Sequence, residues 1–119
     1  MRNADAAVGY GTQQLGATKT TRETEYSVVL RVTQELKKYA NCQVRELPKQ
    51  FAAVERNSKL WDVFVQDVSA NGNKLPAELK AGILSLGAFV EKHTTQVYNR
   101  KATIMPLIEI NEAILKGLR

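Results

Sequence analysis

Hydrophobic residues recur along the chain at the spacing typical of helices. The first series alternates spacings of 3 and 4 residues, which keeps one stripe on one helix face: Tyr26, Val29, Thr33, Leu36 and Ala40. Thr20 and Glu23 have the spacing of a capping box, in which each side chain satisfies a free backbone N–H at a helix start. The pattern predicts a first helix that begins at these residues and ends near Lys37 and Lys38, whose charges suit a helix C-terminus.

Two further series show the repeat that packs one helix along another. The earlier series is Leu47, Phe51, Val54, Ser58, Trp61, Val65 and Val68, and the later one is Leu79, Ile83, Leu86, Val90, His93 and Val97. Pro48 and Pro76 fit the first turns of these two helices, because proline lacks the N–H that a helix interior requires. Gly72 should end the earlier helix, since glycine adopts the left-handed conformation of a helix C-cap. Gly82 and Gly87 each cost the later helix about 1 kcal/mol relative to alanine, so we expect close helix approaches there.

A last helix is predicted from about Thr103 to Gly117, with Pro106 in its first turn. Its apolar side carries Ile104, Leu107, Ile108, Ile110, Ile114, Leu115 and Leu118. The four segments predict an all-α fold, a small up-and-down bundle of about four helices over residues 21–119. Residues 1–20 hold three of the seven glycines and many small polar residues, so we expect a flexible N-terminal arm.

Length, charge and cysteine content limit the class of protein. A chain of 119 residues suits one domain. The 17 Lys and Arg exceed the 12 Asp and Glu, but most basic residues lie a few positions from an acidic one, which disfavours a nucleic-acid binder. Cys42 stands alone, no secretion signal is visible, and no segment approaches the roughly 20 apolar residues that cross a bilayer. We therefore expect a cytoplasmic protein that does not insert into membranes.

Signatures of catalysis and of cofactor binding are missing from the sequence. One histidine and one cysteine cannot supply a zinc site, and the early glycines do not match the dinucleotide-binding spacing. His93 has no visible nucleophile or orienting partner, which favours a structural role in its helix seam. We therefore expect a nonenzymatic protein without metal or cofactor.

Asn111 lies near the centre of the apolar arc of the last helix. A buried amide needs partners, and Ser58 and His93 interrupt the other two seams, so the three residues could form polar layers that fix helix register. The alternative is that Asn111 makes a polar contact to a bound partner.

The second helix carries more apolar surface than its seam requires. Leu60, Val63 and Phe64 project away from the seam, and Trp61 adjoins them as an anchor. Either this helix is central and touches several others, or this face is exposed and receives a partner helix. The second interpretation makes Leu60, Trp61, Val63, Phe64 and Asn111 the candidate partner-binding residues.

Several short strings follow one another along the chain: Thr24-Glu25-Tyr26, Leu60-Trp61, Leu75-Pro76-Ala77-Glu78-Leu79-Lys80 before Ser85-Leu86, and Pro106-Leu107-Ile108-Glu109-Ile110-Asn111 before Gly117-Leu118. In this order and spacing they resemble the bacterial flagellar-biosynthesis regulator family FlaF. The resemblance covers about residues 20–119, and Phe89 stands where many relatives have tryptophan.

The resemblance implies a function in flagellum biogenesis. It implies a cytoplasmic, nonenzymatic chaperone or regulator that is required for flagellin synthesis and export, binds flagellin and acts alongside FlbT. A spare apolar helix face suits this function, because the helices of flagellin need shielding before export. The alternative is a post-transcriptional regulator that binds flagellin mRNA, directly or with FlbT.

Overall fold

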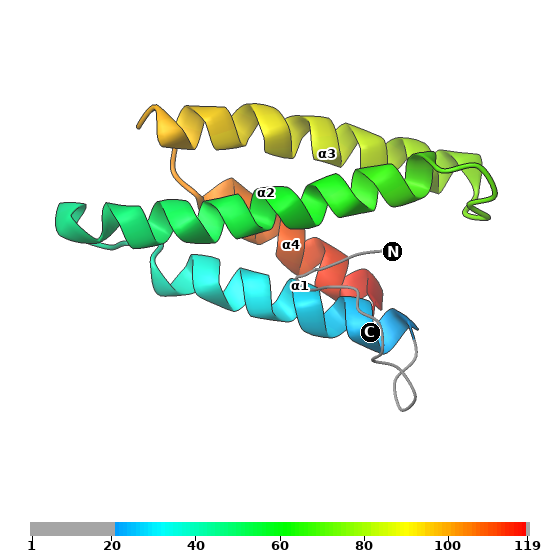
Figure 1. Cartoon of the computed structure of the whole chain (residues 1–119), viewed down its shortest axis with the longest axis horizontal. Helices are drawn as coiled ribbons and strands as arrows, with labels where there is room; N and C mark the ends of the chain where they lie inside the picture. The colour runs from blue at the N-terminus through cyan, green and yellow to red at the C-terminus, as the bar shows by residue number, and fades with distance from the viewer. Residues whose placement is uncertain (1–20, 119) are drawn as a thin grey trace.

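The computed structural model describes residues 21–118, which form four α-helices and one short 3-10 helix. In chain order these are α1 Thr21–Lys38, η2 Val44–Glu46, α2 Leu47–Ser69, α3 Ala77–Tyr98 and α4 Met105–Leu118. The α-helices run alternately in opposite directions (Figure 1), which confirms the predicted all-α bundle. The predicted arm, residues 1–20, lies outside the described residues.

The helix boundaries follow the prolines and the turn glycine of the sequence. Pro48 lies in the first turn of α2, Pro76 caps the start of α3, and Pro106 lies in the first turn of α4. Gly72 has a φ of 87° in the turn after α2, a left-handed conformation that favours glycine. The prolines therefore mark three helix starts, and α1 begins at Thr21, where the Thr20 and Glu23 spacing predicts it.

The helix α2 is the centre of the bundle, with α3 on one side and α1 on the other (Figure 1). Its buried residues form a broad face: Ala53, Val54, Asn57, Leu60, Trp61 and Val68. Val54, Trp61 and Val68 of the predicted seam belong to this face, whereas Ser58 and Val65 of that seam are only half-buried. The surplus apolar residues of α2 had two interpretations. The one in which α2 is central and touches several helices is confirmed for Leu60 and Trp61, which are buried.

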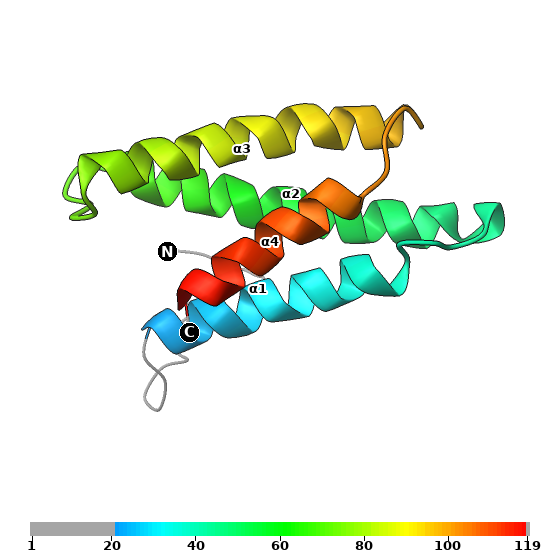
Figure 2. The ribbon, with the colours of Figure 1, turned by 180° about the vertical axis from the view of Figure 1, so that it is seen from behind.

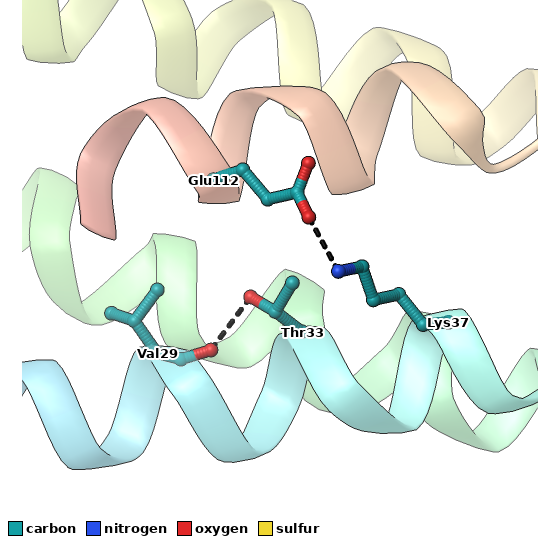
Figure 3. A network of polar contacts seen from close by, with 4 residues as sticks. All are labelled: Val29, Thr33, Lys37 and Glu112. Atoms are coloured by element: carbon teal, nitrogen blue, oxygen red, sulfur yellow. Dashed lines mark hydrogen bonds and ion pairs between the residues drawn. The ribbon is translucent and has the colours of Figure 1, made fainter. Parts of the chain in front are cut away.

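The last helix leaves α3 soon after it begins and packs mainly against α1 (Figure 2). Leu115 packs with Val29 of α1, and Lys37 Nζ lies 2.6 Å from Glu112 Oε2 (Figure 3). All buried residues of α3 lie at or after Gly87. The first half of α3 therefore lacks the cover that α4 would give if it ran alongside.

The two glycines inside α3 have different surroundings. A Cβ at Gly87 would lie 2.5 Å from Val65 Cγ2, so α2 approaches α3 closely at this point. A Cβ at Gly82 would have nothing within 4 Å among the described residues. The expected close approach is confirmed at Gly87 and wrong at Gly82 within the described chain.

Candidate helix-binding surface

The expected partner-binding face on α2 is mostly used inside the bundle. Leu60 is 6% exposed and packs with Val29 of α1 and Leu115 of α4. Trp61 is 2% exposed. The prediction of an exposed apolar face is therefore wrong for Leu60 and Trp61, because α4 crosses toward α1 and brings Leu115 to Leu60 and Asn111 to Trp61 (Figure 2).

The other two α2 candidates differ from each other. Phe64 is half-buried, and its ring meets the Trp61 ring edge-on with centroids 5.4 Å apart. Val63 is 36% exposed and is the only one of the five candidates on the surface. A single exposed valine is ordinary for a protein surface, so α2 offers little for a partner helix in this conformation.

Asn111 is buried in a short chain of hydrogen bonds that joins α2 to α4. Trp61 Nε1 donates to Asn111 Oδ1 at 3.0 Å, and Asn111 Nδ2 donates to Asn57 Oδ1 at 2.8 Å. The structural interpretation of Asn111 is therefore supported, but its predicted partners, Ser58 and His93, are wrong. Sequence reasoning missed Asn57, although it lies four residues before Trp61 and so shares a helix face with it.

An apolar seam runs along α3 on the side that α4 leaves open. We define the α3 seam as Leu79, Gly82, Leu86, Phe89 and His93, whose spacings of 3, 4, 3 and 4 residues are those of helices that pack lengthwise. Leu79 is 51% exposed and Phe89 is 43% exposed, whereas Leu86 and His93 are half-buried. Leu79, Leu86 and His93 belong to the predicted seam, but Gly82 and Phe89 were not included in it.

A groove of about 430 Å³ lies between the α3 seam and α4. It is lined by Leu86, Phe89, Pro106, Glu109, Ile110 and Ala113. Glu109 is the one charged residue in this lining, so the groove offers almost entirely apolar contact. A concave apolar strip between two helices is the shape that accepts the apolar face of a third.

His93 is the last residue of the α3 seam and contacts the groove lining through Phe89. Its Nε2 donates to the carbonyl of Thr103 at 2.8 Å, which ties α3 to the segment before α4. Its ring stacks on the ring of Phe89, with centroids 5.2 Å apart and an interplanar angle of 20°. This pair holds the exposed Phe89 ring against α3, which lowers the entropic cost of using it as a contact.

A second pocket, of about 280 Å³, lies between α2 and α3 and has a different character. Asp62 and Glu91 are part of its lining. Burial raises the pKa of the Asp62 carboxyl above its usual 3.8, and the nearby negative charge of Glu91 raises it further. Within the described part of the chain, no three His, Cys, Asp or Glu side chains come together in a way that could hold a metal ion.

The fold and the surface together define a small all-α bundle with an apolar groove between two of its helices. The sequence pattern of the family described as flagellar protein FlaF matches residues 6–118, nearly the whole chain. The chain therefore belongs to the FlaF family and is a flagellar protein, as the resemblance predicted. No curated protein and no solved structure gives a significant match. Among residues 21–118, no helix has both the length and the apolar character that a membrane crossing requires.

Proposed function

We propose that this protein binds an apolar helix of flagellin along the α3 seam and shields it during flagellin synthesis and export. The observation that carries the proposal is the exposed seam itself, because helix-packing spacing on an uncovered face is typical of a surface that receives another helix. Membership of a flagellar family supports flagellin as the partner.

The dimensions of the seam suit a helix of about four turns. Leu79 and His93 are 14 residues apart, which corresponds to about 21 Å along a helix. A flagellin helix on the seam would place one flank against Phe89 of α3 and the other against Pro106 and Ile110 of α4. Both flanks would then bury apolar surface, at about 25 cal/mol for each Å² removed from water.

Gly82 supports the same position for the partner helix. Glycine inside a helix costs about 1 kcal/mol relative to alanine, and no described residue is close enough to require it. Without a side chain at Gly82, a bound helix can approach the α3 backbone closely between Leu79 and Leu86. The partner helix would then make the close approach that the sequence predicts at Gly82.

The originally predicted residues keep an indirect role in this proposal. Trp61 and Asn111 join α2 to α4 and so fix the position of the α4 side of the groove. They are positioning residues, because both are buried. In the proposal the protein is nonenzymatic, uses no cofactor and acts in the cytoplasm alongside FlbT.

Isothermal titration of purified flagellin into the protein tests the proposal. We expect a complex at micromolar concentration and a loss of affinity of about 30-fold or more for Phe89→Asp, since truncating or charging an anchor costs about 2 kcal/mol or more. Val63→Asp is the matched control, because it adds the same charge to another exposed apolar residue, on α2. Circular dichroism must show that both variants remain folded.

Two results would contradict the proposal. One is a Phe89→Asp variant that is folded and binds flagellin as tightly as the unmodified protein. The other is a Val63→Asp variant that loses as much affinity as Phe89→Asp. The loss would then result from the added negative charge and not from its position on the α3 seam.

A further inference from the structure

The fold gathers positive charge at one end of the bundle, although the charges are dispersed along the sequence. This end is formed where α1 finishes, α2 begins and α3 finishes (Figure 1). Gln50 Nε2 donates to the carbonyl of Tyr39 at 2.8 Å and so joins the end of α1 to α2. The rings of Phe51 and Tyr98 meet edge-on, 5.3 Å apart, and join the start of α2 to the end of α3.

Five exposed cations lie on the segments that meet there. We call them the basic end: Lys38, Arg45, Lys49, Arg100 and Lys101. None of the five makes an ion pair with another described residue, whereas the neighbouring Lys37 is paired with Glu112. Glu46 is the one carboxylate within residues 38–50 and 98–103. The basic end therefore carries most of the net charge of +5.

Arg100 occupies a position that favours glycine. Its φ is 62°, and its N–H donates to the carbonyl of Val97 at 2.9 Å, while the N–H of Lys101 donates to that of Gln96 at 2.8 Å. These bonds close α3 with a left-handed residue, a conformation that disfavours residues with a side chain relative to glycine. Arg100 nevertheless occupies it with an exposed side chain, so its guanidinium adds a cation to this end of the bundle.

We propose that the basic end binds single-stranded RNA through its phosphate groups. The cations come from three separate segments, and a flexible strand with one charge for each nucleotide can meet them in turn. Tyr98, which is 39% exposed and lies two residues before Arg100, offers a ring on which a base can stack, although the Glu55 carboxylate is also near it. A folded acidic protein would instead need an apolar centre to its interface, and on these segments only Val44 and Tyr98 are exposed large hydrophobic residues.

Fluorescence anisotropy with a labelled oligouridylate of about 12 nucleotides tests this inference. Titrations from about 20 to about 200 mM KCl should give a log–log salt slope of up to about −3.5, because each phosphate contact to a single strand contributes about −0.7. Arg100→Gly should make the slope shallower by about 0.7. Glycine adopts this left-handed conformation without strain, so the unfolding free energy of Arg100→Gly should be unchanged or higher. A loss of RNA binding by this variant could then not be explained by unfolding.

Charge reversal at two lysines locates the site. Lys101→Glu should lower RNA affinity by about tenfold or more at low salt. Lys74→Glu is the control, because Lys74 is an exposed lysine in the turn between α2 and α3, at the opposite end of the bundle (Figure 1). Both Arg100→Gly and Lys101→Glu should bind flagellin normally, which separates this inference from the flagellin proposal.

Three outcomes would overturn the inference. The first is the absence of RNA binding even at the lowest salt. The second is an equal loss for Lys74→Glu and Lys101→Glu, which would indicate a response to net charge alone. The third is competition by polyglutamate as effective as that by unlabelled RNA, which would assign the basic end to acidic protein segments.

Discussion

The two glycines inside α3 give a sharp test of the packing, because the same substitution should have opposite effects at the two positions. Gly82→Ala places a Cβ where no described residue lies within 4 Å. Gly87→Ala places one 2.5 Å from Val65 Cγ2. Valine has one strongly preferred side-chain rotamer in a helix, so Val65 cannot rotate this methyl group away at low cost.

The expected magnitudes follow from two effects. Replacing a helical glycine with alanine stabilises a protein by about 1 kcal/mol, and this gain is common to both positions. Overpacking a core costs about 1 to 3 kcal/mol, and this cost applies only at Gly87. We therefore expect Gly82→Ala to raise the unfolding free energy by about 1 kcal/mol. The unfolding free energy of Gly82→Ala should be about 1 to 3 kcal/mol higher than that of Gly87→Ala.

Urea denaturation followed by Trp61 fluorescence and by circular dichroism measures both variants. Trp61 is a suitable probe because it is a buried residue of α2 that hydrogen-bonds to α4, and it is the one tryptophan of the chain. A gain of about 1 kcal/mol should also raise the melting temperature by roughly 4 to 8 °C for a domain of this size.

A double-mutant cycle identifies the contact responsible. In a Val65→Ala background the clashing methyl group is gone, so Gly87→Ala should become as favourable as Gly82→Ala. Equal stabilities of the two single variants, or no rescue by Val65→Ala, would refute the close approach of α2 and α3 at Gly87.

Two further predictions concern polar residues. Asp62→Asn should raise the unfolding free energy at pH 7, because it removes a partly desolvated charge next to Glu91. The pKa of Asp62 in the folded state is raised above 3.8, so the charged carboxylate destabilises the fold fully at pH values above that folded-state pKa and not at all below pH 3.8. In denaturant titrations, the stability gained by Asp62→Asn should therefore disappear below pH 3.8. Asn111→Ala should lower the unfolding free energy by about 2 to 4 kcal/mol, because it leaves the buried Trp61 N–H without an acceptor and creates a cavity; a loss below about 1 kcal/mol in urea denaturation would contradict a structural role.

The order and type of the helices are readable from the sequence because they depend on local features. Within a helix, proline is tolerated only in the first turn, so Pro48, Pro76 and Pro106 indicate helix starts, and the spacing of apolar residues marks the helices that follow them. These effects act within a few residues of one another, so a single sequence is enough to predict them.

Local sequence patterns do not predict which helix covers each face of another helix. Periodicity shows that Leu60 and Phe64 lie off the α2 seam, but not that α4 crosses toward α1 and covers Leu60. The same crossing leaves Leu79 and Phe89 exposed on α3. Interhelical angles depend on contacts between residues far apart in the sequence, and one sequence without relatives does not reveal those contacts.

The charge distribution was also hidden from the linear sequence. Lys49 and Arg100 are 51 positions apart, yet the contact between Phe51 and Tyr98 brings their segments together. In the sequence most basic residues lie a few positions from an acidic one, whereas the antiparallel packing of α2 and α3 brings cations of separate segments to one end (Figure 1).

Site-specific photo-crosslinking tests most directly whether the α3 seam receives flagellin. A benzoylphenylalanine at Leu79, the most exposed seam residue with a side chain, should form a covalent adduct with flagellin on irradiation. The same photoreactive residue at Val63 on α2 should give no adduct. An adduct from Val63 and none from Leu79 would return the binding site to α2 and contradict the account.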